Sequence, residues 1–262
     1  MARKTFFCLF PLLALLVACG NSESSSSGGP PGSSGSSGTS GSSGTSGSSG
    51  TPPPVSNVDG GADPQTGEVR FLSLGDSLTQ GVGANDESTG SWPALLTAKW
   101  KAKGCTVELN NPAIAGYTAE QVVTDQLPNV DTFKPTFVTL QIGANDVANG
   151  VTLEAFRAAV KTIITKAKQS GARVVVMPQN EWFRSPLGQT YPADSGSKRT
   201  TFDQAVIDET KAAGAEFVDL RLLFKQHADN NMWVSDGIHP TPEAYEQWAT
   251  ELARVIPSPC GK

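Results

Sequence analysis

Residues 69–75 read VRFLSLG, and this stretch begins the pattern from which the fold can be predicted. Residues 69–74 form a short apolar run that ends at Gly75, as is typical of a buried strand. From there the chain alternates between short apolar runs and longer segments with helical periodicity. The expected strands cover residues 69–74, 106–109, 136–142, 173–177 and 216–218. The expected helices cover residues 91–103, 118–127, 152–169, 200–213 and 242–255.

Several of these helices carry recognisable end signals. Ser91 and Thr118 each precede a helical segment and can cap it with their hydroxyl groups. Pro93 lies in the first turn of its helix, where a proline costs nothing because its missing N–H has no helical partner there. The segment 152–169 gives the clearest pattern, with apolar residues on one face and Gly171 just beyond its end.

Strands that alternate with helices favour a parallel sheet with helices on both faces. Because crossover connections are right-handed, we expect a three-layer α/β/α sandwich around a central sheet of five parallel strands. In such sheets the functional residues gather beyond the carboxyl ends of the strands.

The first 66 residues differ in composition from the rest. Residues 1–18 begin with Arg3 and Lys4 and continue with an apolar stretch too short to cross a bilayer, which predicts a cleaved export signal. Its end, Leu-Val-Ala before Cys19, resembles a bacterial lipobox, in which cleavage precedes a cysteine that then carries lipid. The alternative is an ordinary signal peptide with a chance cysteine near the cut.

The composition of the next segment predicts a flexible tether. Residues 22–54 are nearly all Ser, Gly, Thr and Pro, so they have too little apolar surface to offset the entropy of ordering. We therefore expect residues 19–66 to be a lipidated cysteine with a disordered linker, and residues 67–262 to form one domain with a full core. The expected location is that of an exported bacterial lipoprotein, at the outer membrane, the cell surface or the periplasmic face.

The charge of the chain argues against nucleic-acid binding. Removal of residues 1–18 takes away two of the 20 basic residues and none of the 25 acidic ones, which leaves a net charge of about −7. The only membrane contact expected is the N-terminal lipid anchor, and the folded domain is expected to be a monomer.

The chain has two histidines, and they differ in their surroundings. His227 lies in a charged stretch, which predicts a solvated surface residue. Asp236 precedes His239 by three residues, so its carboxylate can reach the ring across one tight turn and fix its tautomer. A structural turn with a satisfied histidine would explain this spacing equally well.

Ser77 follows the first expected strand, so its hydroxyl belongs at a carboxyl strand end. A turn in which Asp76 and Ser77 act only as caps is the alternative. The G-x-S-x-G elbow of α/β-hydrolases is absent around Ser77, which excludes that fold.

Four blocks of sequence, taken in order, resemble those of the SGNH or GDSL-type hydrolases, a family with a flavodoxin-like α/β fold. The first is GDSLTQG at residues 75–81, and the second is NPAIAG at residues 111–116. The third is GAND at residues 143–146, and the last is DGIHP at residues 236–240. Together they span nearly the whole segment from residue 69 to residue 255.

The resemblance implies a site of five residues. Ser77 matches the nucleophile, His239 the base and Asp236 the acid of the family's triad. Gly116 and Asn145 match its oxyanion-hole residues, with the Ser77 backbone N–H as a third donor. No metal or other cofactor is expected, because this mechanism needs none and no C-x-x-C or H-E-x-x-H spacing occurs.

The expected function is hydrolysis of carboxylic esters, with thioesters as a further option, in acyl lipids or acylated carbohydrates. Acyl transfer to a sugar or alcohol acceptor and a non-catalytic tethered binding protein are the alternatives. Trp182, Phe183 and Tyr191, in the loop after the fourth strand, either line the substrate pocket or cover the sheet edge.

Two cysteines remain once residues 1–19 are set aside. Cys105 precedes the second expected strand and Cys260 follows a helix that runs back from the catalytic end, so both belong at the amino end of the sheet. We expect a disulfide between them, with two unpaired thiols as the alternative.

Overall fold

The structure is a computed structural model that describes residues 67–260. The predicted signal peptide, the lipidation of Cys19 and the linker lie outside the described residues. Between residues 67 and 260, no helix is both long enough and apolar enough to span a membrane.

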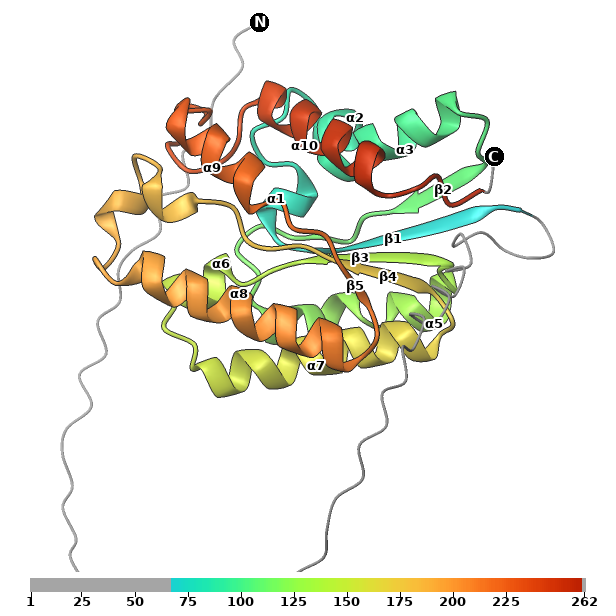
Figure 1. Cartoon of the computed structure of the whole chain (residues 1–262), viewed down its shortest axis with the longest axis horizontal. Coiled ribbons are helices and arrows are strands. Elements are labelled where there is room, and N and C mark those ends of the chain that lie inside the picture. The colour runs from blue at the N-terminus through green and yellow to red at the C-terminus, as the bar shows by residue number, and fades with distance from the viewer. Residues whose placement is uncertain (1–66, 261–262) are drawn as a thin grey trace, which may run out of the picture. The chain divides into compact units, whose positions relative to one another are not determined.

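A sheet of five parallel strands forms the centre of the domain, in the order β2-β1-β3-β4-β5. The strands are β1 (Val69–Gly75), β2 (Val107–Asn110), β3 (Phe137–Gln141), β4 (Arg173–Val176) and β5 (Glu216–Phe217). Helices cover both faces of this sheet (Figure 1), so the predicted three-layer α/β/α fold is confirmed. Each strand begins and ends within one residue of its predicted bounds.

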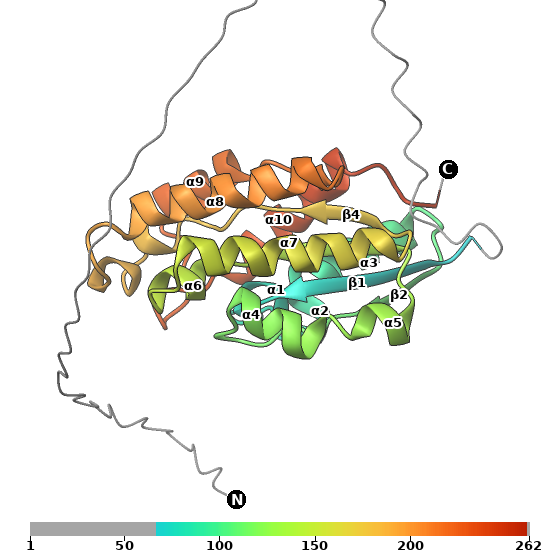
Figure 2. The same cartoon turned by 90° about the horizontal axis from the view of Figure 1, so that it is seen from below.

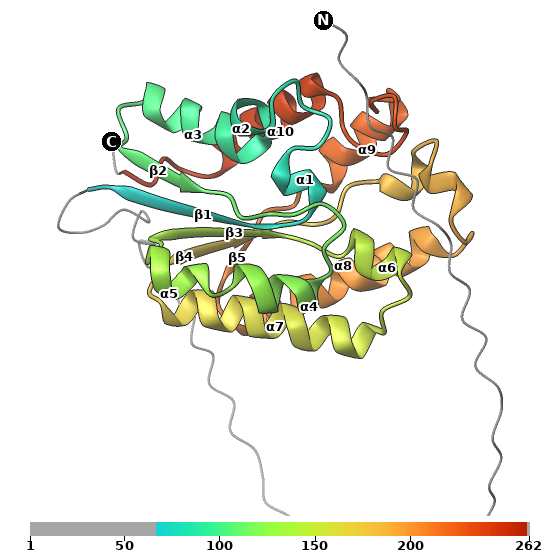
Figure 3. The same ribbon diagram turned by 180° about the vertical axis from the view of Figure 1, so that it is seen from behind.

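The helices fall into two layers (Figures 1 and 3). One layer holds α1 (Ser77–Gln80), α2 (Glu87–Gly90), α3 (Trp92–Ala102), α9 (Arg221–Asp229) and α10 (Pro242–Val255). The other holds α4 (Ala119–Gln121), α5 (Asn129–Phe133), α6 (Ala144–Ala148), α7 (Leu153–Gln169) and α8 (Ser195–Ala212). Seen from below in Figure 2, α7 and α8 run side by side beneath the sheet.

The central strands β1, β3 and β4 are largely apolar because both faces of the sheet pack against helices. Leu72 and Leu74 of β1 belong to the core under α7 and α8. Phe71, on the opposite face, packs edge-on against Phe137 of β3 and lies beside Trp100 of α3. The alternation of side chains along a strand therefore fills two separate cores from one short run.

Several local features differ from the sequence prediction. Ser91 occupies the N-cap position of α3, but its side chain makes no capping hydrogen bond and is buried. The predicted helix 118–127 is a short α4 followed by a π-helical turn, Val122–Gln126. Its first residue, Thr118, donates its backbone N–H to the Gln121 side chain at 2.9 Å.

The predictions for two helices in the C-terminal half were wrong. Helix α8 begins at Ser195, five residues before the predicted start, because its first turn is polar and shows no apolar periodicity. Gly196 in that turn packs closely on Phe183, where a Cβ would lie 2.9 Å from the ring. Helix α9 was not predicted, since only a short apolar stretch interrupts its charged residues.

The prediction for His227 was wrong. Its side chain is buried between α9 and α10, with 5% exposure, and its Nε2 pairs with Gln247 Oε1 at 3.1 Å. Burial lowers the pKa of His227, against the raising effect of the Gln247 hydrogen bond. Phe224, one turn earlier on the same face of α9, is buried beside it. This histidine holds the two helices together and takes no part in the site described below.

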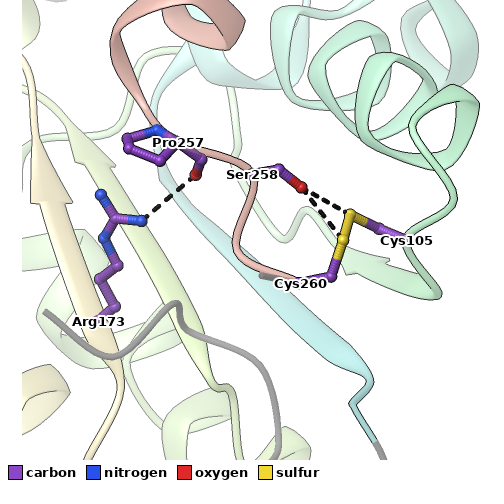
Figure 4. Close-up of a disulfide and its surroundings, with 5 residues drawn as sticks. All are labelled: Cys105, Arg173, Pro257, Ser258 and Cys260. Atoms are coloured by element: carbon purple, nitrogen blue, oxygen red, sulfur yellow. Dashed lines mark hydrogen bonds between the residues drawn. A yellow bond between two sulfur atoms is a disulfide. The ribbon is translucent and has the colours of Figure 1, made fainter. Parts of the chain in front are cut away.

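Cys105 and Cys260 form a disulfide at the amino end of the sheet, with their Cα atoms 5.6 Å apart (Figure 4). The Ser258 hydroxyl lies 2.9 Å from Cys105 Sγ and 3.1 Å from Cys260 Sγ. Nearby, Arg173 donates to the Pro257 carbonyl at 3.5 Å, so the C-terminal segment is attached to both β2 and β4.

Loss of this disulfide should lower stability without changing activity. The bridge closes a loop of 155 residues, and a crosslink over that length restricts the unfolded chain by about 2–5 kcal/mol. We expect the Cys105→Ser/Cys260→Ser variant to unfold at lower urea concentration than the oxidised protein. Reduced wild-type protein should match the variant, and kcat should stay unchanged, because the bridge lies far from the carboxyl strand ends. Two alkylatable thiols in unreduced protein would contradict the assignment.

Candidate active site

The carboxyl ends of the strands open onto a cavity of about 230 Å³. In Figure 1 this is the end of the sheet beside α1 and α6. It lies between β1 and β3, where the strand order reverses and where ligands bind in open α/β sheets. The cavity is lined by Asp76, Ser77, Leu78, Ala115, Gly116, Ala144, Asn145, Ala148, Asn180, Trp182, Leu187, Tyr191, Ile238 and His239.

Ser77 sits at the sharp turn from β1 into α1. Asp76 caps this helix, with its Oδ1 accepting the Leu78 N–H at 3.1 Å. Gly75 must be a glycine, because a Cβ there would collide with the Thr79 side chain and the Gln141 carbonyl. As a result Ser77 is 9% exposed and lines the cavity.

Asp236 and His239 form the closest polar contact of the site. His239 Nδ1 lies 2.6 Å from Asp236 Oδ2, while Asp236 Oδ1 accepts the N–H groups of Ile238 at 2.9 Å and His239 at 3.0 Å. Burial raises the pKa of Asp236, but these hydrogen bonds outweigh it and leave the pKa below its ordinary value. The ionised carboxylate thus fixes Nδ1 as the protonated nitrogen, and within the described residues Nε2 makes no hydrogen bond.

The loop that carries His239 is held by backbone contacts on both sides. Gly83 adopts a φ of 101°, and a Cβ there would strike the Pro240 carbonyl. The His239 carbonyl accepts the Val234 N–H at 2.9 Å, and the Gly237 carbonyl accepts the Leu187 N–H at 2.8 Å. The position of the ring therefore depends on the packing of the loop as well as on Asp236.

Among residues 67–260, no hydrogen bond joins Ser77 to His239. Both side chains line the same cavity. Such bonds are often long or poorly aligned before a substrate is bound, so this arrangement is compatible with proton transfer between them.

Two backbone N–H groups at the cavity are unused. The Ile114 carbonyl accepts the Tyr117 N–H at 3.3 Å, and Gly116 adopts a φ of 84° at the third position of this turn. Nothing lies within 4 Å of where a Gly116 Cβ would be, so its backbone faces open space. Within the described part of the chain, neither Gly116 nor Ser77 donates its backbone N–H, so both donors remain available to a ligand.

Asn145 is the second residue of helix α6, and its side-chain amide is a third donor at the cavity. Its Nδ2 donates to the Tyr117 carbonyl at 3.0 Å and lies 3.4 Å from Asp76 Oδ2. The first contact fixes the amide plane, and the second is long enough to give way to a stronger acceptor in the cavity. The structure therefore brings together Ser77, Gly116 and Asn145 on one wall of the cavity, with His239 lining it as well.

If Asn145 binds an oxyanion, its loss should affect the rate more than binding. We expect Asn145→Ala to lower kcat by roughly two to three orders of magnitude with little change in KM. The matched control is Asn149→Ala, which removes an exposed asparagine one helical turn further along. A raised KM with normal kcat in Asn145→Ala would show that the amide only binds substrate.

Asp76 and Asp146 are two buried carboxyl groups, and Asp76 also lines the cavity. Burial raises the pKa of Asp76 to about 7, against the lowering effect of the Leu78 N–H, and the Asp146 charge raises it further. Burial raises the pKa of Asp146 to about 6, although both its oxygens accept the Ala119 N–H at 3.1 Å. Asp76 was not singled out from the sequence, because a short polar residue after a strand reads as turn chemistry alone.

Stability should therefore fall as the pH rises from about 4 to about 7. The folded protein keeps the Asp76 proton up to about pH 7, whereas the unfolded chain loses it near pH 4. Between these values the folded state binds more protons, so the free energy of unfolding declines by up to about 1.4 kcal/mol per pH unit. We expect Asp76→Asn to flatten this decline in urea titrations from pH 4.5 to 7.5. An unchanged slope would mean that Asp76 is ionised throughout.

Two of the three aromatic residues singled out in the loop after β4 line the cavity. Trp182 and Tyr191 line the cavity, with their ring centroids 5.5 Å apart and their planes nearly perpendicular. Phe183 is not a lining residue and packs against the core under the sheet. Leu187 and Ile238 complete the apolar part of the wall and had no signal in the sequence, because loop residues show no periodicity.

Comparison with known proteins assigns the chain to a class of enzyme. It is 29% identical over 185 residues to an arylesterase of Vibrio mimicus, covering 70% of this chain and 85% of that one. It is 27% identical over 188 residues to the thioesterase 1/protease 1/lysophospholipase L1 of Escherichia coli K12, covering 71% and 82% of the two chains. The chain is a carboxylic ester hydrolase.

Its family follows from a match over most of the folded domain. The chain belongs to the GDSL-like lipase/acylhydrolase family, whose model matches residues 73–247. The fold is shared with a solved structure of TesA, with a TM-score of 0.59 and 23% identity over 70% of this chain and 95% of that one. It is also shared with an acetyl xylan esterase from Geobacillus stearothermophilus, with a TM-score of 0.61 and 18% identity over 72% and 94% of the chains.

Proposed function

We propose that this enzyme cleaves esters with Ser77 as nucleophile, His239 as general base and Asp236 as the residue that orients the base. The observation that carries the proposal is the short Asp236–His239 contact in a cavity shared with Ser77 and with two unused backbone N–H groups. Acyl transfer through a serine requires a nucleophile, an oriented base and unpaired donors for the oxyanion.

The proposed reaction proceeds in two halves. His239 Nε2 takes the Ser77 proton as the hydroxyl oxygen attacks the acyl carbon, and the same proton is then given to the leaving alcohol. Negative charge on the carbonyl oxygen is stabilised by the N–H groups of Ser77 and Gly116 and by the Asn145 amide. Water then attacks the acyl-enzyme with His239 again as base, which releases the acid and restores Ser77.

The size and lining of the cavity favour substrates with a short, uncharged acyl group. Its volume of about 230 Å³ lies below the range of roughly 300–1,000 Å³ usual for drug-sized ligands. Its wall is mainly apolar, and none of the described residues that line it is a lysine or an arginine. The relatives include an arylesterase, a thioesterase/lysophospholipase and an acetyl xylan esterase, which differ in the group attached to the acyl carbonyl.

We also propose that the enzyme is exported and anchored through lipid on Cys19. The basic start, the short apolar stretch and the cysteine that follows it support this proposal, as set out above. Metabolic labelling with a palmitate analogue should modify the full-length protein but not a Cys19→Ser variant.

Two measurements on purified protein test the catalytic proposal. A fluorophosphonate probe should add once per chain, and peptide mass spectrometry should locate the adduct on Ser77. A series of nitrophenyl esters of increasing acyl length should give the highest kcat/KM for short chains, and acetylated xylan and lysophospholipid should then distinguish the alcohol parts. Labelling of another serine, or turnover without labelling, would contradict the assignment of the nucleophile.

A further inference from the structure

Gln80, a residue outside the proposed triad and oxyanion hole, spans the gap between the helix of the nucleophile and the turn that carries Gly116. It lies at the end of α1, three residues after Ser77. Its side-chain oxygen accepts the Ala115 N–H at 2.7 Å, across 35 residues of sequence. Ala115 directly precedes Gly116, so this bond fixes the peptide next to the proposed oxyanion donor.

The other end of the Gln80 amide is anchored as well. Its Nε2 donates to Glu87 Oε2 at 2.8 Å, and Glu87 is the first residue of α2. A carboxylate acceptor makes this a charge-assisted hydrogen bond, which orients the amide group. The Gln80 oxygen is thereby directed at Ala115 and cannot exchange places with the nitrogen without losing both bonds.

The turn at Ile114–Tyr117 connects the Gln80–Ala115 hydrogen bond to Gly116. Its two central residues, Ala115 and Gly116, have N–H groups that the turn's own hydrogen bond leaves unpaired. Gln80 takes the first of them, and the second stays free at the cavity. A second hydrogen bond, from Asn111 Nδ2 to the Thr79 carbonyl at 2.8 Å, holds only the start of the segment 111–117.

We propose that Gln80, oriented by Glu87, is a positioning residue that sets the direction of the Gly116 N–H relative to Ser77. This proposal rests on the oxyanion role proposed above for Gly116. Because the nucleophile and the donor come from different strands, their relative placement depends on side-chain links of this kind. A misplacement of about 1 Å can cost roughly 100-fold in rate.

The first test removes the link without adding bulk. We expect Gln80→Leu to lower kcat by roughly 10- to 100-fold while KM for a short-chain nitrophenyl ester stays within about threefold. The matched control is Gln204→Leu on α8, where the Gln204 side chain donates to Asp208 Oδ1 at the same 2.8 Å. The control should keep its kcat, and the melting temperatures of the two variants should be similar.

A second test exchanges the donor and the acceptor. In Gln80→Glu, two carboxylates face each other at pH 8, and kcat should fall about tenfold. In the Gln80→Glu/Glu87→Gln double variant, the side-chain amide at position 87 can donate a hydrogen bond to the carboxylate at position 80. That carboxylate can also accept the Ala115 N–H, so both links of the wild-type protein are restored. We expect this double variant to recover to within about threefold of the wild-type kcat. Failure of the double variant to recover would contradict the proposal that Glu87 orients Gln80.

A third test is independent of activity. Amide hydrogen exchange at Ala115 should be about tenfold faster in Gln80→Leu than in wild type or Gln204→Leu, because the N–H loses its acceptor. Unchanged amide hydrogen exchange at Ala115 would overturn the proposal. A raised KM with normal kcat would overturn it as well. The serine mechanism fails separately, if Ser77→Ala retains turnover. If Ser77→Ala is inactive and Gln80→Leu has normal kcat, only the role of Gln80 is refuted.

Discussion

Replacement of Ser77 by alanine is expected to lower kcat for a short-chain nitrophenyl ester by roughly 10⁵- to 10⁶-fold. The variant retains the oxyanion donors but has no hydroxyl to attack the acyl carbon. Removal of a single member of a catalytic triad leaves only the 10³- to 10⁴-fold acceleration over water that binding and the oxyanion hole supply. Turnover should be measured on protein purified without contact with wild-type enzyme, since a trace contaminant would exceed the expected rate.

The fold should survive this substitution, because Ser77 makes no hydrogen bond through its side chain within the described residues. Urea unfolding should therefore be close to wild type, and fluorophosphonate labelling should be lost. Ser197→Ala, which removes an exposed hydroxyl on α8, serves as the control and should label normally. Turnover of Ser77→Ala within tenfold of wild type would falsify the assignment of the nucleophile.

The second large effect is expected at His239. His239→Ala removes the group that accepts the Ser77 proton, and we expect a loss in kcat of similar size. Because the serine and the histidine act as one unit, the Ser77→Ala/His239→Ala double variant should be no slower than either single variant. Additive losses would mean that the two residues act in separate steps.

The chain offers a natural comparison for this experiment, because it contains one other histidine, His227. His227→Gln should lower stability, since the ring is buried and paired with Gln247 between α9 and α10. Its kcat should remain within about threefold of wild type. The two variants thus separate loss of a base from loss of packing.

The sequence predicted the parts of the fold whose residues follow a regular period. Helix α7 shows this best, because its apolar residues recur on one face and Thr152 caps it through a hydrogen bond to the Ala155 N–H at 3.2 Å. The strands were found from their apolar runs, which exist because both faces of the sheet are buried. Neither feature requires knowledge of distant contacts.

What the sequence could not predict depends on contacts between distant segments. The start of α8 is set by the packing of Gly196 on Phe183, and the burial of His227 is set by a partner on α10. The site shows the same division. Ser77, Gly116, Asn145, Asp236 and His239 were recognisable from motifs, whereas the link from Gln80 to Ala115 joins positions that no local pattern relates.

The position of the disulfide has a practical consequence. β1 starts at Val69 and the bridge holds Cys260, so the described domain begins and ends at the amino edge of the sheet, opposite the cavity (Figure 1). A purification tag, a surface linker or a fusion partner attached near either boundary would therefore leave the mouth of the cavity unobstructed. Enzyme coupled to a solid support through one of these boundaries should present its cavity away from the support, toward large or insoluble esters.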